Sequence, residues 1–213
     1  MSVLDTATPV LSASTLIRNE PVQARSTARL ATLLDSAAAV IAEMGYERLT
    51  TAMVAERAGA SIGTVYRYFP DRIAVLQSLA ARNAERMMGR VAAELVAGRH
   101  ASAADAVVAL VELTAGLFRS EPGYRSLRGG DVLDLLPAPT EMTANATLAH
   151  VVADSIVLNH AVANTADMRR AVGTAVEVVD ALVARAFARS SSGSSSLLAE
   201  AERAVRAILA AQL

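Results

Sequence analysis

Cysteine, lysine and tryptophan are all absent from the 213-residue sequence. Without cysteine the chain cannot form disulfides, thiolate zinc sites, iron–sulfur clusters or a cysteine nucleophile. Without lysine it cannot use Schiff-base chemistry or a P-loop. The three histidines are scattered, and no HExxH, GxGxxG or GxSxG motif is present. The sequence therefore gives little support to an enzyme or a cofactor carrier of the common classes. We expect neither catalysis nor a bound cofactor.

Long apolar runs are missing too. No stretch reaches the roughly 18 uncharged apolar residues that a membrane-spanning helix needs. Residues 1–20 also lack the basic region and sustained apolar run of a signal peptide. We therefore expect a cytoplasmic protein without a membrane segment.

Alanine is what the sequence has in abundance. There are 46 alanines, hydrophobic residues make up 53% of the chain, and aromatic residues only 3%. This composition favours packed helices over sheets. Apolar residues recur at helical spacing, and the predicted segments include 102–120, 140–163, 167–189 and 195–212. We expect an all-α fold of about nine helices, with no strand.

The most informative segment is residues 49–72, which reads as two short helices joined by a tight turn. Ala55 is small enough for the helices to cross closely. Gly59 supplies the positive φ that the turn needs, and Ser61 is placed to cap the second helix. Val65 provides an apolar anchor one turn further on. Together these features predict a helix-turn-helix.

The other face of the second helix carries groups suited to nucleic acid. Short hydroxyl, guanidinium and phenol side chains can bond phosphates and base edges in a major groove, and here they are Ser61, Thr64, Arg67 and Tyr68. Gly63 has no side chain to hold a partner away. Residues 57–72 contain three arginines against one aspartate, a net charge of +2 in a chain whose net charge is -1. Since any helical protein has caps and glycine stops, a structural motif without DNA binding stays open as an alternative.

The whole pattern resembles the DNA-binding domain of TetR-family transcriptional regulators over about residues 28–79. The resemblance is carried by an alanine-rich first helix followed by Gly45-Tyr46, Leu49-Thr50-Thr51, Val54-Ala55-Glu56-Arg57-Ala58-Gly59 and Gly63-Thr64-Val65-Tyr66-Arg67-Tyr68-Phe69-Pro70-Asp71-Arg72. It implies a helix-turn-helix DNA-binding domain over 25–72 and an effector-binding and dimerisation domain over 73–213. Residues 1–24 are rich in serine, threonine, alanine and valine with two prolines, and we expect them to form a flexible arm.

The resemblance also implies roles for single residues. Thr51 is similar to a phosphate-contacting cap, Tyr66 to an aromatic that meets phosphate or thymine methyls, and Arg72 stands where the family usually has lysine. Phe69 and Tyr46 are expected to pack inside the head. The complete set of expected DNA contacts is Arg25, Thr50, Thr51, Ser61, Ile62, Gly63, Thr64, Tyr66, Arg67, Tyr68 and Arg72.

The remainder of the chain carries no motif that fixes a chemistry. The family plan implies an effector pocket, for which the candidates are Met88, Leu117, Phe118, Tyr124, His150, Asp154 and Asn159. His150 and Asp154 are four residues apart on one predicted helix, but no third ligand is evident and we expect no metal site. The absence of tryptophan and the scarcity of aromatics indicate an aliphatic pocket or a small one. We expect a small apolar or amphipathic effector.

The last two predicted helices, about 167–189 and 195–212, carry apolar stripes. The family plan makes them the interface of a homodimer, whereas an intramolecular core explains the stripes equally well. A twofold dimer would read a palindromic double-stranded operator with half-sites about one DNA turn apart. The function expected from the sequence is a repressor released by a small molecule. The alternatives are a helix-turn-helix head kept as a protein-interaction module, and a helical small-molecule-binding protein or enzyme.

Overall fold

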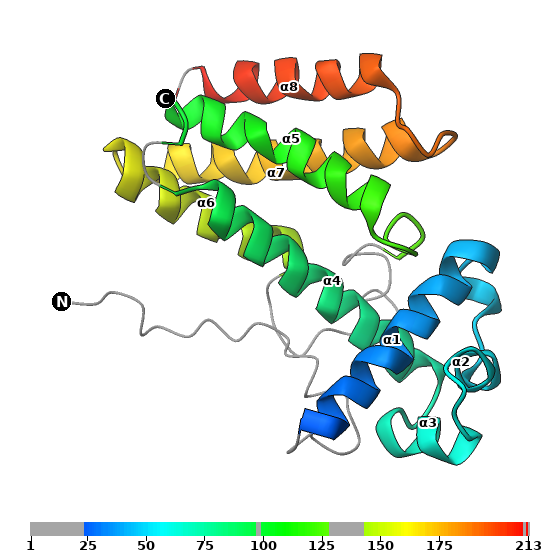
Figure 1. Cartoon of the computed structure of the whole chain (residues 1–213). Coiled ribbons are helices and arrows are strands. Elements are labelled where there is room, and N and C mark those ends of the chain that lie inside the picture. The colour runs from blue at the N-terminus through cyan, green and yellow to red at the C-terminus, as the bar shows by residue number, and fades with distance from the viewer. Residues whose placement is uncertain (1–23, 97–98, 128–142, 211, 213) are drawn as a thin grey trace. The chain divides into compact units, whose positions relative to one another are not determined.

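The computed structural model describes residues 24–96, 99–127, 143–210 and 212. These residues form eight α-helices and one short 3-10 helix, and no strand occurs among them. The helices are α1 (Ala24–Met44), α2 (Thr51–Arg57), α3 (Ile62–Tyr68), α4 (Arg72–Glu94), α5 (Ala103–Ser120), α6 (Ala144–His160), α7 (Ala166–Phe187) and α8 (Ser195–Leu209), with the 3-10 helix η2 at Tyr46–Arg48 (Figure 1). The all-α prediction is confirmed. No helix in the described part of the chain is long and apolar enough to cross a bilayer.

Each helix from α2 to α8 has a local start signal. The residue before it is a serine, threonine or aspartate whose side chain accepts a hydrogen bond from a backbone N–H three residues further on. These capping residues are Thr50, Ser61, Asp71, Ser102, Thr143, Thr165 and Ser194. A side-chain cap of this kind stabilises a helix by about 1 kcal/mol. The helix start expected at Ser61 is confirmed.

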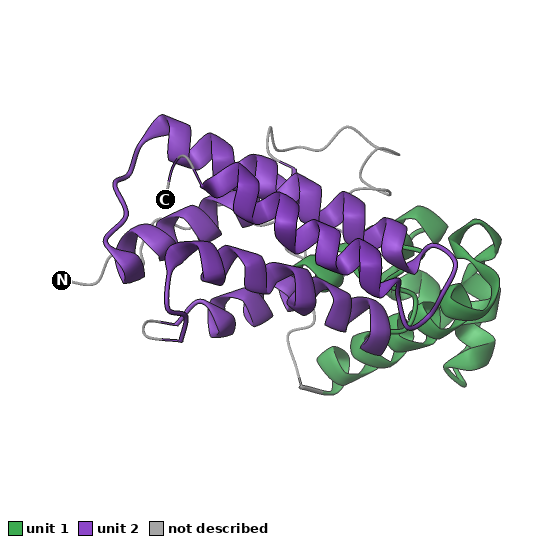
Figure 2. Ribbon diagram, turned by 90° about the horizontal axis from the view of Figure 1, so that it is seen from above, with its two compact units in different colours: residues 1–84, 122–141 green, residues 85–121, 142–213 purple. Residues whose placement is uncertain are grey.

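The chain divides into two compact units by its internal contacts (Figure 2). Unit 1 contains residues 1–84 and 122–141, and unit 2 contains residues 85–121 and 142–213. The border on the N-terminal side therefore falls inside α4, after Ala84. The domain border expected at residue 72 coincides with the start of this helix, and the arm expected over residues 1–24 lies almost entirely outside the described residues.

Unit 1 is a small helical head with one apolar core. The core is lined by one side of α1, by α2 and α3, and by the first part of α4. Its fully buried large side chains include Leu33, Ile41, Leu49, Phe69, Leu76 and Leu79. Phe69 has no exposed surface, so its predicted core position is confirmed. Tyr46 is half-buried and packs against the same core, as expected.

Residues 122–127 also belong to unit 1, although they follow α5 in the sequence. Leu127 is completely buried in the core of the head. Gly123 has φ +73°, and a Cβ placed there would lie 2.7 Å from the carbonyl oxygen of Ala38 in α1. Only glycine allows this close approach of the two backbones. A breaker-rich segment far along the chain thus completes the core of the N-terminal head.

Unit 2 is a helical bundle in which α5 is buried on most sides. Helices α6, α7 and α8 all pack against α5, and α7 packs most extensively against α8 (Figure 1). The rings of Phe118 in α5 and Phe187 in α7 lie 5.2 Å apart. Gly193, between α7 and α8, has φ +81° and lies directly against the Phe187 ring. The tight link therefore holds these two helices side by side.

Candidate nucleic-acid interface

Helices α2 and α3 form the helix-turn-helix that the sequence predicts. The Oγ1 of Thr50 accepts a hydrogen bond from the Met53 N–H at 3.2 Å. After α2 the chain turns through Gly59, whose φ is +56°, and the Ala60 N–H bonds the Ala55 carbonyl at 2.9 Å. The Ser61 Oγ then accepts from the Thr64 N–H at 3.1 Å and starts α3.

One face of α3 is anchored in the head. Val65 and Phe69, just after the helix, have no exposed surface, and Ala55 of the facing α2 is 5% exposed. Because Val65 and Phe69 are four residues apart, their side chains lie on the same side of α3. Their burial fixes the rotation of α3 about its axis and decides which side chains remain outside.

The other face of α3 is open to solvent. Its exposed residues are Ser61, Ile62, Gly63, Tyr66 and Arg67, and Thr64 is half-buried beside them. Ile62 and Tyr66 are 43% and 44% exposed, although both are large and partly apolar. The hydroxyls of Ser61 and Thr64 lie 2.9 Å apart. This face offers hydroxyls, a phenol, a guanidinium and an apolar side chain to a partner.

Glycine at position 63 is not explained by packing within the chain. Within the part of the chain that the structure describes, a Cβ placed there would meet only the Ser61 Oγ, at 3.9 Å, which is an ordinary van der Waals distance. Glycine inside a helix costs about 0.5–1 kcal/mol relative to alanine. The head therefore carries a destabilising residue at the centre of its open face, where a partner could approach closely.

Further candidates flank this face. Thr50 is exposed, and the half-buried Thr51 donates from its Oγ1 to the Tyr66 hydroxyl at 3.4 Å. Arg72 is half-buried at the first position of α4, and Arg25 is exposed in the first turn of α1. All the sequence-predicted contact residues thus lie in unit 1, on or next to α2, α3 and the starts of α1 and α4.

Tyr68 departs from the expectation of an exposed contact. Its side chain is 5% exposed, and its hydroxyl lies 3.0 Å from the Ser26 Oγ in α1. Tyr68 is three residues after the buried Val65, so the last turn of α3 carries its ring toward the core rather than to the open face. The predicted exposure of Tyr68 was wrong.

Two arginines of the head, Arg57 and Arg67, contact other side chains of the head in different ways. Arg57 in α2 pairs with Glu43 in α1 at 2.7 Å. The hydrogen bond from Arg57 holds the pKa of the Glu43 carboxyl below its ordinary value, and their opposite charges act in the same direction. Arg57 therefore links two helices. The guanidinium of Arg67 lies 5.6 Å from the centre of the Tyr68 ring, on which it stacks.

The candidate effector residues are dispersed in the structure. Leu117 and Phe118 are buried in α5, Met88 is half-buried in α4, and Tyr124 is buried in unit 1. The remaining candidates share α6: His150 is exposed and bonds the Ala146 carbonyl, Asp154 is exposed and pairs with Arg169, and Asn159 is half-buried and donates to the Leu95 carbonyl at 2.6 Å. Each of these three polar groups therefore bonds a different partner. Within the described ranges, no three side chains of metal-binding type form a cluster.

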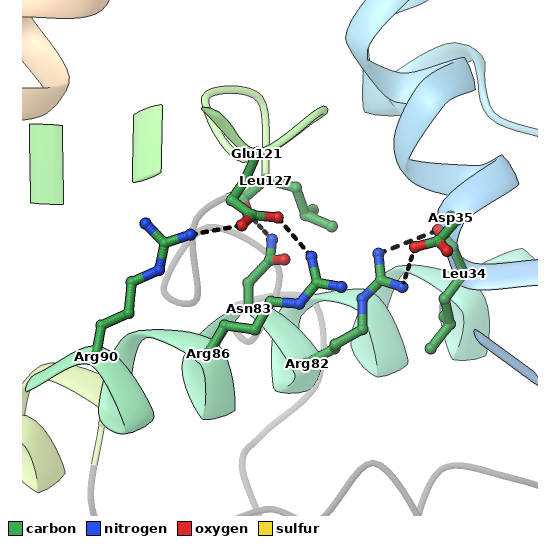
Figure 3. A network of polar contacts seen from close by, with 8 residues as sticks. All are labelled: Leu34, Asp35, Arg82, Asn83, Arg86, Arg90, Glu121 and Leu127. Atoms are coloured by element: carbon green, nitrogen blue, oxygen red, sulfur yellow. Dashed lines mark hydrogen bonds and ion pairs between the residues drawn. The ribbon is translucent and has the colours of Figure 1, made fainter. Parts of the chain in front are cut away.

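Sequence reasoning missed a set of polar contacts along α4 (Figure 3). Arg86 and Arg90 converge on the two carboxylate oxygens of Glu121, at 2.5 and 2.8 Å. The buried Asn83 donates from its Nδ2 to the Leu127 carbonyl at 3.1 Å. The four-residue spacing of the arginines was visible in the sequence, but nothing there identified Glu121 as their common partner.

Comparison with known proteins covers both parts of the chain. Residues 33–79 match the family model of tetR-family bacterial regulatory proteins, and residues 101–213 match that of tetracyclin repressor-like C-terminal domains. The HTH-type transcriptional repressor KstR of Rhodococcus jostii (strain RHA1) is 43% identical over 58 residues, which is 27% of this chain and 27% of KstR. KstR of Mycobacterium tuberculosis (strain ATCC 25618 / H37Rv) is 36% identical over 66 residues, 31% of this chain and 30% of that protein. The chain therefore matches these curated relatives over less than a third of their length.

Solved structures extend the similarity over most of the fold. A TetR-family transcriptional regulator from Streptomyces coelicolor aligns with a TM-score of 0.71 and 29% identity, covering 87% of this chain and 99% of that one. FadR from Bacillus subtilis aligns with a TM-score of 0.60 and 16% identity, covering 84% and 96%, which shows the fold alone. Because one family model matches more than half of its length and a second matches its head, the chain belongs to the TetR family of bacterial regulatory proteins.

Proposed function

We propose that the protein is a sequence-specific DNA-binding repressor, and that a small apolar or amphipathic effector lowers its affinity for its operator. The observation that carries this proposal is the open face of α3. Ile62 and Tyr66 remain 43% and 44% exposed on it while Val65 behind them is fully buried. A helix fixed in this way presents one face to a major groove.

The residues of this face suit distinct parts of a duplex. Arg67 can donate two hydrogen bonds to guanine, and Ile62 can contact a thymine methyl. Tyr66 and Thr51 lie close enough to share a phosphate, since their hydroxyls are 3.4 Å apart. Arg25 and Arg72 add charge-assisted phosphate contacts at the two edges. The matches to KstR repressors support the same assignment.

A homodimer through α7 and α8 forms part of the proposal. Both helices bury one apolar stripe in unit 2, including Met168, Val172, Val179, Val205 and Leu209. Further apolar side chains on the same helices are only half-buried, namely Val178, Leu182, Leu197, Leu198 and Ile208. These are the side chains that a second copy would cover. Two copies would place two recognition helices on a palindromic operator in the cytoplasm.

The effector class rests on the interior of unit 2. In its described part, the buried residues are all apolar except for Thr114. A fold neighbour, FadR from Bacillus subtilis, was solved in complex with stearoyl-CoA, a molecule with a long apolar chain. We infer that an effector of this chain binds in unit 2, with its apolar part packed there, and favours a dimer whose heads no longer match successive major grooves. A bound effector that left operator affinity unchanged would contradict this mechanism.

Fluorescence anisotropy tests the central proposal. The full chain is titrated into labelled duplex from the region upstream of its own gene, with nonspecific competitor, between about 0.05 and 0.3 M salt. We expect saturable binding by a dimer and an affinity that falls steeply as salt rises. Tyr66→Ala and Arg72→Ala should weaken binding with little change in the melting temperature.

Two results of these experiments would contradict the proposed assignments. If neither this duplex nor any sequence from a random-site selection binds above competitor, the head serves as a protein-interaction module. If either variant unfolds, the altered side chain supports the core and its assignment as a contact is wrong.

A further inference from the structure

Tyr68 connects three parts of the head. Its hydroxyl lies 3.0 Å from the Ser26 Oγ in the first turn of α1, across 42 positions of sequence. Its ring carries the guanidinium of Arg67 at 5.6 Å and is tilted against the Phe69 ring, with 6.5 Å between the ring centres. Because the side chain is 5% exposed, it has little surface left to offer to DNA.

We propose that Tyr68 and Ser26 are a positioning pair that holds the first turn of α1 beside α3, the recognition helix. This position lets Arg25 and α3 contact the same duplex. This inference rests on the proposed DNA binding. In it, Arg25 supplies a phosphate contact, and Tyr68 acts through Arg25 and touches no DNA. Figure 1 shows the N-terminal end of α1 next to α3 within unit 1.

The first turn of α1 needs support from outside the helix. Arg25 is the second residue of α1, and no acidic side chain occurs in this turn. A positive charge near a helix N-terminus opposes the helix dipole, and the first N–H groups of a helix have no partners within it. Such a turn frays readily, and an arginine on a fraying turn delivers its charge to a phosphate poorly. The Ser26–Tyr68 contact ties this turn to the end of α3.

The pair links two helices, unlike the hydroxyls of Thr32 and Ser36 in α1. Thr32 and Ser36 bond carbonyl oxygens four residues earlier in the same helix. Thr32 is exposed and has no bond to another helix among the contacts of the described chain. Replacement of Thr32 therefore provides a matched control, because it removes a hydroxyl from α1 and leaves the link to α3 intact.

The first experiment measures DNA affinity as a function of salt by fluorescence anisotropy, on duplex from upstream of the chain's own gene. Each phosphate contact contributes about 0.9 to the slope of log K against log salt. Because the proposed dimer carries two copies of each residue, we expect Tyr68→Phe, Ser26→Ala and Arg25→Gln each to reduce the slope by about 1.8 and the affinity by roughly 3- to 10-fold. Ser26→Thr should restore wild-type binding, and Thr32→Val should change nothing.

The combination of variants separates positioning from direct contact. If Tyr68 acts through Arg25, the double variant of Tyr68→Phe with Arg25→Gln binds no more weakly than Arg25→Gln alone. Fully additive losses would mean that the two residues contact DNA independently and would overturn the proposal. Unchanged binding by Tyr68→Phe would overturn it as well.

A second measurement needs no DNA. Hydrogen exchange of the free protein should show faster exchange of backbone amides in the first two turns of α1 in Tyr68→Phe, with exchange elsewhere in the head preserved. Unchanged protection there would refute the link even if the protein binds DNA. If the wild-type protein binds no DNA but Tyr68→Phe still exchanges faster in α1, the Ser26–Tyr68 link is retained and the proposed DNA binding is rejected. The failure of the link and the failure of the proposed function are therefore distinguishable.

Discussion

Replacement of Gly63 by alanine separates the stability of the head from its binding of DNA. Gly63 is the second residue of α3, is exposed, and has room for a Cβ, since the nearest atom would be the Ser61 Oγ at 3.9 Å. Alanine in a helix is more stable than glycine by about 0.5–1 kcal/mol. For a protein of this size, that gain raises the melting temperature by about 1–4 °C.

DNA binding should change in the opposite direction. If α3 enters a major groove, the added methyl group meets the duplex where the backbone now approaches it. Loss of one or more base or phosphate contacts at about 1–3 kcal/mol each weakens binding by roughly 5- to 150-fold. Thermal denaturation and fluorescence anisotropy on the same preparation measure the two effects.

Gly89→Ala is the matched control. Gly89 is also exposed and helical, in α4, and a Cβ there would have no neighbour within 4 Å. We expect the same small stabilisation with unchanged DNA affinity. A Gly63→Ala protein that binds DNA like the wild type would refute the docking of α3, and one that melts at a lower temperature would refute the open space around Gly63.

Three further predictions concern stability. Leu127→Ala should lower the free energy of unfolding by about 3 kcal/mol in denaturant titrations, because the side chain is fully buried in the head core; a loss below about 0.5 kcal/mol would mean that residues 122–127 only cover its surface. Thr114→Val should raise it by about 1 kcal/mol, because the buried Thr114 hydroxyl has no hydrogen-bond partner among the described residues, and a loss of stability would contradict that. Glu43 has its folded pKa lowered by Arg57, so its stabilising effect is present above the ordinary value of 4.5 and is lost as the pH falls through the lowered pKa. The melting temperature of Glu43→Gln should therefore lie below that of the wild type at pH 7, and this difference should vanish in acid; a constant difference would exclude the ion pair.

Local chemistry made the helix-turn-helix predictable from sequence. The cap at Ser61 and the turn at Gly59 depend on residues within a few positions of one another, and both appear in the structure where the sequence placed them. Val65 could be assigned to the core because a short helix has few apolar residues to bury. These features need no knowledge of distant parts of the chain.

The orientation of Tyr68 was less accessible. Tyr66 and Tyr68 are two residues apart, which places them roughly 200° apart around a helix, so they cannot share a face. Spacing from Ser61 and Thr64 suggested the open face for Tyr68, whereas spacing from Val65 suggested the core. The Ser26 hydroxyl, 42 positions away, favours the buried arrangement, and local periodicity could not reveal it.

Long-range packing was beyond prediction from one sequence. Leu127 lies in a segment rich in helix breakers, yet it is fully buried in the N-terminal head. His150 and Asp154 do share a face of α6, as their spacing predicts, but Leu148, Val152 and Ile156 occupy the buried side and leave that face exposed. Periodicity can group residues on a helix. It does not say which other helix they meet.

The caps that precede α2 to α8 have a consequence for how this chain tolerates insertions and deletions. Each helix begins at its own serine, threonine or aspartate, so its start is specified locally and not by the length of the preceding link. Doubling the length of a loop costs only about 0.6 kcal/mol in closure entropy, less than a cap contributes. A link that has neither a buried residue nor a tight turn can therefore change in length while the helix after it keeps the same residues turned toward the core.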